Sequence, residues 1–589
     1  IPAKNISDQE QIRQIILEGW KAGKIVAIKG IGGYMLTCDA HHQVAIQTLR
    51  QRKNRPSKPL AVMFPDLDAL KAALHCPEEA ERLLEGPIAP IVILPQKPSA
   101  GDALCLAEIA PGMNTVGAMI PYAPAFAWLL SAWGRPIIAT SGNQSGSGIL
   151  YQDENIHQAL GDIADLIVVH NREITFPQDD SVISFGQHPE TQIWLRRSRG
   201  LAPGVRIASP CVPELPTLAM GADLKACFAL NPHGRVIASP YLGDLQHFRP
   251  QQTYRLMLTR IQQIQQFSPQ VILTDAHPGY ASCSLGQEIA NQLKIPRHQV
   301  QHHEAHFAAL LGEHGLCQAP GPVLGFVWDG TGYGSDGQIW GGEVFSYTHG
   351  KFRRDACLRP FPQLLGDKMS AEPRLSALSL ASSVKGLDMA PVRAFFSPQE
   401  WSLYSRLIQR KPPLMTSSMG RLFDGVGAWL LKKPLNHYEG EAAILLEQLA
   451  RRWEGADSLS EVPAYPILLA SKPIDWRPMI REILEDLRAG VSTHFIAYRF
   501  HWSLVHLIRM LGRASSSERW GFTGGVFQNS LLGDLIREHL SQEAELYFHQ
   551  VFPPNDEHLA FGQLVHHHIT QSFSSVYSQP QVHVSSHTR

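Results

Sequence analysis

The sequence predicts an α/β protein built from more than one folding unit, and three observations lead to this prediction. Short apolar segments of strand length alternate with segments of helical periodicity along most of the 589 residues. A proline-rich segment at residues 203–216 interrupts this alternation, which then starts again. A chain of this length also forms about three to four folding units, each with its own core.

The composition describes a well-packed protein without a strong overall charge. Hydrophobic residues make up 44% and charged residues 18% of the chain, and the formal net charge is -1. With so balanced a charge we expect no stable nucleic-acid partner. The eight cysteines include no C-x-x-C pair, which predicts reduced thiols and a cytoplasmic location. The longest uncharged segment, between Glu108 and Arg135, contains three prolines, so we expect no membrane span.

The chain opens with a predicted helix, a strand and a glycine-rich turn. Residues 8–22 carry apolar side chains at helical spacing, and an apolar strand at residues 25–28 leads into the turn Lys-Gly-Ile-Gly-Gly-Tyr at residues 29–34. Glycines after a strand indicate close approach of the backbone to a ligand. Such a turn alone does not identify the ligand.

A cluster of cations follows this turn. Residues 50–58 hold five cations in nine residues, among them Lys53, Arg55 and Lys58, and the prolines near the end of the segment keep it extended. Phosphate is the natural ligand of such a cluster, because Lys and Arg donate charge-assisted hydrogen bonds to phosphate oxygens. A solvated surface segment has the same composition, so the cluster by itself leaves both interpretations open.

A third segment points to nucleotide binding by the first 205 residues. The apolar strand at residues 136–139 ends in small hydroxyl and amide groups, and the segments Asp-Ser-Val at 180–182 and Leu-Arg-Arg-Ser-Arg-Gly at 195–200 follow. In order and spacing these segments resemble the YrdC family of carbamoyl-adenylate-forming domains, over essentially all of residues 8–205. The resemblance implies a twisted, mixed α/β sheet around a positively charged cavity, where ATP and carbamate give an acyl-adenylate and pyrophosphate.

The same resemblance implies roles for individual residues of the first part. It places the phosphates on Lys53, Arg55 and Lys58. It places the nucleotide and carbamate pocket on Ser141, Asn143, Ser181 and Arg196. Stand-alone members of the family carry a threonine- and tyrosine-rich turn where this chain has Gly-Ile-Gly-Gly at residues 30–33, which favours a substrate smaller than a threonine derivative.

The second part repeats the alternation of strands and helices. A helix at residues 254–267 precedes a buried strand that ends in an acid at residues 271–275. A further buried strand at residues 324–328 stops at the turn Asp-Gly-Thr-Gly-Tyr-Gly, residues 329–334, before a second strand through residues 339–345. Such a hairpin can wrap phosphate with backbone N–H groups, although a tight hairpin without a ligand has the same sequence pattern.

A second turn of this kind comes late in the chain. The segment Thr-Gly-Gly-Val-Phe-Gln-Asn, residues 523–529, joins a strand to a predicted helix at residues 531–540, whose N-terminus can hold phosphate. Asp556 then stands at a junction between a strand and the final helix. Two such turns about 190 residues apart indicate a two-lobed actin-like or hexokinase-like (ASKHA) architecture, in which a nucleotide lies between the lobes.

The segment His-His-Glu-Ala-His at residues 302–306 is the candidate metal site. In a helix His302 and His306 lie one turn apart on the same face, which suits two ligands of one metal ion. Two histidines bonded to carbonyls or water are the alternative, and spacing alone leaves both open. The pattern differs from the His-Glu-x-x-His of zinc peptidases, because Glu304 is followed by a histidine after two residues.

Together these motifs resemble the HypF family of carbamoyltransferases, and the second part looks like a TsaD-type carbamoyl-transfer domain. The matched segments of the second part lie at residues 302–306, 329–334, 340–343, 419–428, 438–443, 523–529 and 552–556. The resemblance carries the metal ligands onto His302, His306, Asp329 and Asp556, a set that suits Zn²⁺ or Fe²⁺. It carries the nucleotide contacts onto Gly330, Thr331, Gly420, Asp424, Gly524, Gly525 and Asn529.

The HypF resemblance also implies the reaction. Carbamate derived from carbamoyl phosphate is adenylated with ATP, which Mg²⁺ accompanies, and the carbamoyl group then passes to the C-terminal cysteine of the protein HypE. This step leads to the cyanide ligand in the maturation of nickel-iron hydrogenases. We expect Lys53 and Arg55 to act in the adenylation and His302 and His306 in the transfer. Members of the family begin with an acylphosphatase domain and a zinc-finger region that this sequence does not contain, so we expect it to be part of a longer protein.

These interpretations give three expected regions and three competing functions. We expect a YrdC-like domain at residues 1–205, a two-lobed TsaD-like domain at 210–570 and a disordered tail at 571–589. The leading alternative is a tRNA threonylcarbamoyladenosine-forming enzyme, which needs threonine and a basic tRNA surface. An antibiotic O-carbamoyltransferase has the two domains in the opposite order, and a nucleotide-dependent scaffold would not turn nucleotide over.

Overall fold

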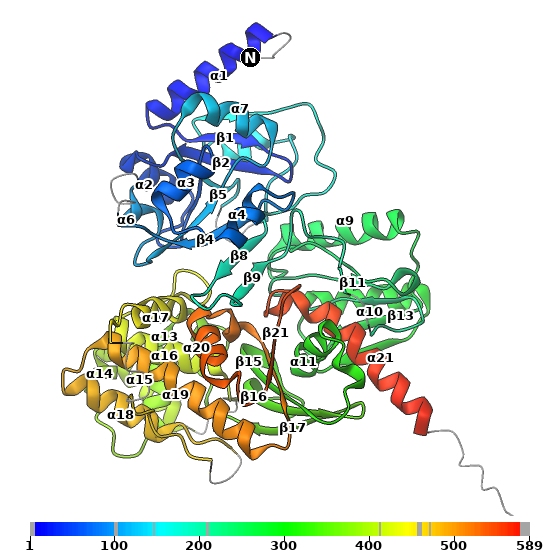
Figure 1. Cartoon of the computed structure of the whole chain (residues 1–589), viewed down its shortest axis with the longest axis vertical. Helices are drawn as coiled ribbons and strands as arrows, with labels where there is room; N and C mark the ends of the chain where they lie inside the picture. Colours follow the sequence, from blue (N-terminus) through cyan, green and yellow to red (C-terminus); the bar gives the residue numbers. More distant parts are fainter. Residues whose placement is uncertain are drawn as a thin grey trace, which may run out of the picture.

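The structure of the chain is a computed structural model, in which a nine-stranded sheet stands above two lobes with a sheet each (Figure 1). It describes residues 6–98, 104–144, 148–207, 211–410, 414–455, 462–469 and 473–577. Within these ranges no helix combines the length and the apolar character needed to cross a bilayer. The prediction of an α/β protein with a mixed first sheet and a two-lobed second part is confirmed.

The first sheet contains nine strands in the order β7-β1-β2-β6-β3-β5-β4-β8-β9, with both parallel and antiparallel pairs. Its strands are β1 Val26–Lys29, β2 Tyr34–Asp39, β3 Ala61–Met63, β4 Ile91–Pro95, β5 Thr115–Met119, β6 Ile137–Ser141, β7 Leu166–Val168, β8 Val182–Phe185 and β9 Gln192–Arg196. Its helices are α1 Ile6–Lys21, α2 Gln43–Arg52, α3 Leu67–Ala73, α4 Glu78–Glu85, α6 Leu106–Ile109, α7 Pro124–Trp133 and α8 Ile156–Leu160.

Two apolar cores cover the two faces of this sheet. On one face α1 and α7 pack through Trp20, Phe126 and Leu130, all nearly inaccessible to solvent. On the other face α2 contributes Ile46 and Leu49 to a separate core. With both faces covered, β1 and β2 are buried along their whole length, whereas the edge strands β7 and β9 are only partly buried.

The first lobe of the second part contains a five-stranded sheet in the order β12-β11-β10-β13-β14. Its strands are β10 Thr217–Ala219, β11 Ala229–Leu230, β12 Ile237–Ala238, β13 Val271–Asp275 and β14 Arg297–Val300. Its other elements are η1 Pro232–Gly234, α9 Phe248–Ile264 and α10 Ala281–Leu293. The strand predicted at residues 271–275 is confirmed as β13, whereas the helix predicted from residue 254 begins six residues earlier, because Pro250 fits its first turn.

The second lobe contains a seven-stranded sheet, in which β18-β19-β16-β15-β20-β21 are neighbours and β17 also pairs with β16. Its strands are β15 Val323–Tyr333, β16 Ile339–Thr348, β17 Lys351–Cys357, β18 Phe361–Pro362, β19 Met415–Thr416, β20 Arg519–Thr523 and β21 Glu545–Phe548. The prediction that β15 stops before Asp329 is wrong. The strand continues to Tyr333 through a shift of register between Trp328 and Gly332, because β16 supplies partners on both sides of the shift.

Helices cover this sheet and join the two lobes. The helical elements of the second lobe are α12 Lys368–Ala371, α13 Pro373–Ser382, α14 Ala390–Arg393, α15 Pro398–Gln409, α16 Met419–Leu431, α17 Glu441–Arg451, α18 Arg477–Arg488, α19 Thr493–Ala514, η4 Gly525–Gln528 and α20 Ser530–Leu540. The elements that lie between the lobes are α11 His302–Glu313, η2 Leu316–Gln318, η5 Asp556–His558 and α21 Leu559–Tyr577. Helices α11 and α21 pack side by side through small and apolar residues such as Ala309 and Phe561.

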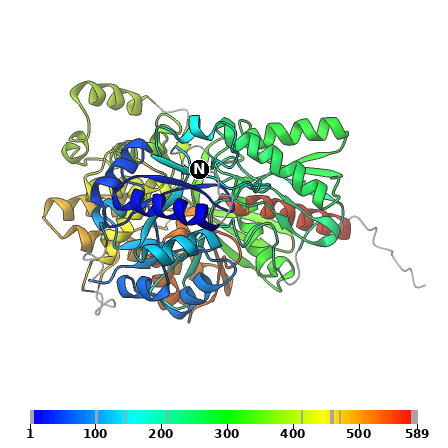
Figure 2. The same cartoon turned by 90° about the horizontal axis from the view of Figure 1, so that it is seen from above.

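Helix α21 extends into the segment expected to be a disordered tail. Helix α21, red in Figure 1, includes residues 571–577, so the first part of the predicted tail continues this helix. Residues 578–589 lie outside the described residues. Viewed from above, α21 lies beneath the elements of the first lobe (Figure 2).

Candidate active site

Four side chains from three elements of the second half converge between the lobes. His302 and His306 project from the first turns of α11, whose N-terminus is capped when the Gln301 side chain accepts the Glu304 N–H. Asp329 lies at the register shift of β15, and Asp556 opens η5. All four predicted metal ligands are thereby brought together, and each is less than a tenth exposed.

The separations between these ligand atoms fit one shared cation. The Nε2 atom of His302 lies 3.7 Å from Oδ2 of Asp329 and 4.0 Å from Oδ1 of Asp556, and the corresponding distances from His306 are 3.8 and 3.6 Å. These contacts are too long for hydrogen bonds. Donor atoms about 2.1 Å from a tetrahedral zinc ion are separated by about 3.4 Å. The arrangement therefore matches a small divalent ion better than a set of direct hydrogen bonds.

Hydrogen bonds behind the two histidines leave their Nε2 atoms facing the centre. The Nδ1 atom of His302 lies 2.8 Å from Oδ2 of Asp275, and Nδ1 of His306 lies 2.6 Å from Nε2 of His558. Both Nε2 atoms are buried without a hydrogen-bond partner in the structure. Such orphaned nitrogens are costly unless a ligand binds them, and a carboxylate behind an imidazole is the usual support of a metal-binding histidine.

The Asp329 carboxylate is ionised and oriented by its surroundings. Burial alone raises the pKa of this carboxyl, but the imidazoles of His302 and His306 hold its pKa well below the ordinary value. The backbone N–H of Gly525 donates to Oδ1 of Asp329 over 3.0 Å, which leaves Oδ2 facing the histidines. The residues present thus supply two imidazoles and two carboxylates, a donor set that fits Zn²⁺ or Fe²⁺.

The loop that carries Asp556 is held by the first part of the chain. The amide of Asn555 donates to the carbonyl of Leu195 over 3.2 Å, and the backbone N–H of Arg197 donates to Oε2 of Glu557 over 2.8 Å. Both contacts come from the end of β9, which reaches down toward the lobes in Figure 1. One of the four ligands is therefore positioned by main-chain groups of the nine-stranded sheet region.

A cavity of about 1020 Å³ extends from the first sheet to this centre. Asp329 and Asp556 line one part of it, and Gly32 and Tyr34 of the first glycine-rich turn line another. Eleven predicted site residues that are not metal ligands also line it: Arg55, Lys58, Ser141, Asn143, Arg196, Gly330, Thr331, Gly420, Asp424, Gly525 and Asn529. Residues predicted from the motifs of both parts therefore share one cavity.

His302 and His306 lie behind the cavity wall, and of the predicted residues that are not metal ligands three do not line the cavity, Lys53 among them. The Lys53 ammonium is fully buried and donates to the carbonyls of Ser141 and Asn143 over 2.6 and 2.5 Å and to the side-chain oxygen of Asn143 over 2.8 Å. Its three donors are thus used inside the protein. In place of the expected phosphate contact, Lys53 holds the end of β6, where Ser141 and Asn143 meet the cavity.

Ser181 and Gly524 are the other two. The Ser181 side chain is inaccessible to solvent, and its hydroxyl donates to the Arg199 carbonyl over 2.8 Å. This hydrogen bond joins the start of β8 to the segment after β9. Gly524 has a φ of 99°, and a Cβ atom there would lie 2.3 Å from the Trp328 carbonyl oxygen. A glycine at position 524 therefore lets the chain after β20 pass close to Trp328 of β15. The neighbouring Gly525, not Gly524, lines the cavity.

Two of the cations that line the cavity, Arg55 and Lys58, lie within electrostatic reach of other cations. Burial, together with Arg50 and Arg196, lowers the pKa of Arg55 to about 10, and burial together with Arg55 and Arg196 lowers that of Lys58 to about 8. Mutually repelling cations in a cavity favour an anionic ligand, and a triphosphate meets this requirement. Within the cluster Arg50 and Lys53 are buried, whereas Arg52 and Lys58 are exposed, so the solvated-surface interpretation holds for only part of it.

On the side of the second lobe, protein contacts fix the residues expected at the nucleotide. The side-chain oxygen of Asn529 accepts the N–H of Leu532 over 2.9 Å and so caps α20, while its amide nitrogen lies 2.9 Å from Nε2 of His501. Arg421 forms an ion pair of 2.7 Å with Asp424. A ligand in this part of the cavity would therefore contact backbone groups and side chains that protein contacts already hold in place.

Sequence reasoning missed the residues that support the ligands: Asp275, His558, Asn555 and Glu557. A single acid at the end of β13 and a single histidine after Asp556 carry no spacing signal of their own. Asp275 alone could have been found from the sequence, because an acid at the carboxyl end of a buried strand lies at the edge of the sheet where ligands bind.

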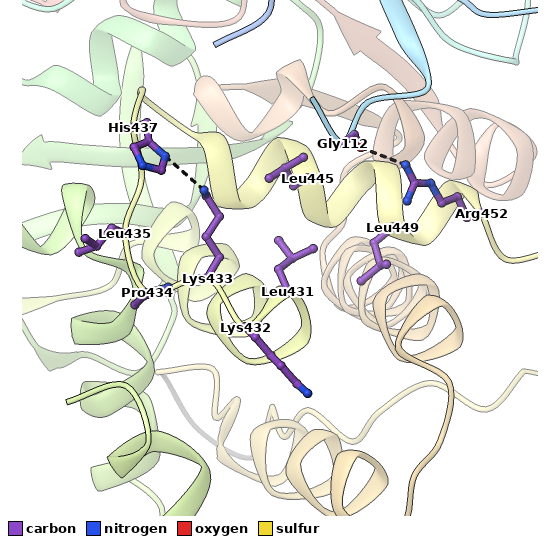
Figure 3. A pocket seen from close by; sticks show the side chains of 10 residues that line it. All are labelled: Gly112, Leu431, Lys432, Lys433, Pro434, Leu435, His437, Leu445, Leu449 and Arg452. Carbon is purple, nitrogen blue, oxygen red and sulfur yellow. Dashed lines mark hydrogen bonds between the residues drawn. The ribbon is translucent and has the colours of Figure 1, made fainter. Parts of the chain in front are cut away.

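A second, smaller cavity of about 490 Å³ lies at the other face of α17. Figure 3 shows Leu431, Leu445 and Leu449 near its centre, and the Arg452 guanidinium donates to the Gly112 carbonyl over 3.0 Å. His437 lines both cavities. None of the predicted site residues lies in this smaller cavity.

Family models match three consecutive parts of the chain. A model described as "Telomere recombination", which covers Sua5, YciO and YrdC proteins, matches residues 18–198. The "HypF Kae1-like domain" matches residues 213–313, and "Carbamoyltransferase, Kae1-like Domain, second subdomain" matches residues 325–563.

Whole-chain relatives agree with these matches. The chain is 36% identical to "Carbamoyltransferase HypF" of Synechocystis sp. over 95% of its own length and 73% of the relative's. A crystal structure of full-length HypF in the phosphate- and nucleotide-bound form matches with a TM-score of 0.85 and 33% identity, over 94% of this chain and 86% of that one. The HypF of T. kodakarensis matches with a TM-score of 0.86 and 29% identity, over 95% and 74% of the two chains.

Proposed function

The chain belongs to the carbamoyltransferase HypF family, and from this premise we propose that it joins two reactions in one cavity. In the first, carbamate derived from carbamoyl phosphate reacts with ATP to give carbamoyl-adenylate and pyrophosphate. In the second, the carbamoyl group passes to the C-terminal cysteine of HypE, for the cyanide ligand of nickel-iron hydrogenases. Residues 1–205 carry the adenylation and residues 210–570 carry the transfer. A tRNA threonylcarbamoyladenosine-forming role is disfavoured, since the whole-chain relatives are carbamoyltransferases.

The adenylation takes place among the cations of the first part. Arg55, Lys58 and Arg196 bind the triphosphate, with Mg²⁺ accompanying ATP, and Ser141 and Asn143 border the carbamate. A carbamate oxygen attacks the α-phosphorus, the bond from that phosphorus to the bridging oxygen breaks, and pyrophosphate leaves with the electron pair. Lys53 acts by fixing Asn143, and Ser181 by fixing the segment that carries Arg196.

The transfer takes place at the centre formed by His302, His306, Asp329 and Asp556. A Zn²⁺ or Fe²⁺ ion bound there supplies Lewis acidity toward a carbonyl oxygen. The protein's part is to present two imidazoles, whose Nδ1 protons are held by Asp275 and His558 on the far side. Gly330, Thr331, Gly420, Gly525 and the Arg421–Asp424 pair border the adenylate.

The observation that carries this proposal is the continuous cavity between the two sets of residues. Carbamoyl-adenylate is hydrolysed readily, so it has to stay away from bulk water until the acceptor thiol attacks it. A single cavity that is lined both by Arg55 and Lys58 and by Asp329 and Asp556 of the metal centre meets this need. A scaffold that only binds nucleotide has no use for the connection.

The test is a reaction with purified protein, ATP and carbamoyl phosphate, with a parallel reaction in which ammonium carbamate replaces carbamoyl phosphate. Mass spectrometry should detect carbamoyl-adenylate, and pyrophosphate and AMP should form with a cysteine-terminated acceptor present. The acceptor thiol should gain the mass of one carbamoyl group. Threonine-dependent adenylate in place of carbamoyl-adenylate would support the alternative, and no nucleotide turnover in either reaction would refute the proposal.

A further inference from the structure

Between the two reaction centres the cavity wall carries an ion pair to which neither centre has yet given a role. Lys225 lies in the loop after β10 of the first lobe, and Glu439 lies in the loop before α17 of the second. Both line the cavity, and the Lys225 ammonium donates a hydrogen bond to Oε1 of Glu439. The pair therefore links the two lobes inside the cavity.

The charges around this pair place it between the two centres. On one side Lys58 lowers the pKa of Glu439, after the larger effect of Lys225. On the other side Asp556 helps Glu439 to raise the pKa of Lys225 above its ordinary value, although burial opposes this. The Lys225 ammonium is thus charged and lies within electrostatic reach of both a phosphate-binding cation and a metal ligand.

The two partners differ in how firmly they are held. The Glu439 side chain is 68% exposed, whereas that of Lys225 is only 20% exposed. Because Glu439 faces open cavity, an incoming anion can displace its carboxylate from Lys225. The Lys225 backbone is also constrained, with a φ of 46° that favours glycine. Among the described non-glycine residues with positive φ, Lys225 is the one that lines this cavity, and such strain is concentrated at functional sites.

The transfer step needs a cation at this position. When the acceptor thiolate attacks, a bond forms between its sulfur and the carbamoyl carbon, and the bond from that carbon to the phosphate oxygen breaks. AMP leaves with the electron pair, so its phosphate changes from one negative charge to two. A cation beside this oxygen stabilises the transition state more than the bound adenylate, which accelerates the step.

We propose that Lys225 binds the phosphate of carbamoyl-adenylate and stabilises AMP as the leaving group, and that Glu439 holds Lys225 in place until that phosphate arrives. The assignment rests on the proposed function and adds a catalytic residue to its second reaction. Lys58 and Arg196 belong to the adenylation end of the cavity, and Arg421 is already paired with Asp424. Lys225 is a cation whose partner, Glu439, is exposed enough for the substrate to replace it.

The test compares two rates in the full chain: carbamate-dependent exchange of pyrophosphate into ATP, and carbamoylation of a peptide that ends in cysteine. Lys225→Met should lower the ratio of carbamoylation to exchange by at least about tenfold, and Lys225→Arg should lower it by less than about threefold. Lys24→Met, a change of an exposed lysine in the first part, is the matched control and should keep the ratio. Lys225→Gln repeats the test if Lys225→Met does not fold.

The double change Lys225→Glu with Glu439→Lys separates catalysis from a structural role. The ion pair can re-form with its charges exchanged, but a carboxylate then faces the leaving phosphate. We expect a ratio no higher than in Lys225→Met. Restoration of the ratio by the double change, or an unchanged ratio in Lys225→Met, would overturn the proposal while leaving the two-step function intact. If the unmodified chain showed no carbamate-dependent exchange, the proposed function itself would fail.

Discussion

The Nδ1 atom of His306 lies 2.6 Å from the Nε2 atom of His558, whose own Nδ1 atom lies 2.7 Å from the carbonyl oxygen of Pro553. A carbonyl can only accept, so His558 carries its proton on Nδ1 and accepts with Nε2. His306 must then carry its proton on Nδ1, which leaves the lone pair of Nε2 directed at Asp329 and Asp556. One backbone carbonyl thereby determines the tautomer of a histidine two steps away.

The first prediction follows from this chain of hydrogen bonds. His558→Ala and Asp275→Asn should each weaken metal binding by about 10- to 100-fold, because each removes the group that orients a ligand imidazole. Competition with a chromophoric chelator would measure the affinity. The double variant His302→Ala/His306→Ala should retain no stoichiometric metal, and metal in that variant at the level of the unmodified chain would exclude this site.

A second prediction separates Arg55 from Lys53. Arg55→Ala should lower carbamate-dependent ATP–pyrophosphate exchange by at least about tenfold with little effect on thermal unfolding, since Arg55 faces the cavity. Lys53→Met should lower both the exchange and the unfolding temperature, because Lys53 is buried and bonded to Ser141 and Asn143. Equal effects of the two changes on unfolding would contradict the different places of the two side chains.

The third prediction concerns pH. Burial and neighbouring cations lower the pKa of Lys58 to about 8, so its ammonium is charged below this pH and becomes neutral above it. The kcat/KM for ATP in the exchange reaction should therefore fall as pH rises through about 8, because this parameter reports on the free enzyme. Lys58→Arg keeps its charge in this range and should remove the fall. An identical pH profile in both proteins would rule out Lys58 as the titrating group.

The fourth prediction uses two glycines with positive φ, of which Gly134 is left-handed helical with a ψ of 7° and Gly524 has a ψ of 158°. Gly524 and Gly134 have φ values of 99° and 71°, but a Cβ atom at Gly524 meets the Trp328 carbonyl while one at Gly134 meets nothing within 4 Å. Gly134→Ala should cost about 1–2 kcal/mol, the expected penalty of a left-handed alanine. Gly524→Ala should cost clearly more, because strand ends must separate. Urea unfolding followed by tryptophan fluorescence would compare them.

Much of the architecture could be predicted because it rests on local patterns. The strand at residues 271–275 is a continuous apolar run that ends in an acid, and the structure has β13 at the same residues. The pair of histidines in α11 was found by helical spacing alone, and the distances to Asp329 and Asp556 agree with the set carried over from the family. These signals are visible in the sequence because neighbouring residues produce them.

What could not be predicted depends on distant partners. The glycine-rich segment after Trp328 has the composition of a turn, and only pairing with β16 keeps it in a strand. Cations at positions 53 and 55 have the same pattern in sequence, yet one turns inward to the end of β6 and the other faces the cavity. The support of His306 by His558 spans 252 residues, and no local pattern encodes it.

The contacts of Asn555 with the Leu195 carbonyl and of Glu557 with the Arg197 amide bear on how far this protein is modular. Asp556, the fourth metal ligand, lies between Asn555 and Glu557 in one loop, and the groups that hold these two residues belong to the first part of the chain. Severing the chain after residue 205 would leave each half with its own sheet but would release this loop whenever the halves part. Metal loading would then report on the assembly of the halves, and the transfer centre would be complete only where an adenylating partner is docked beside it.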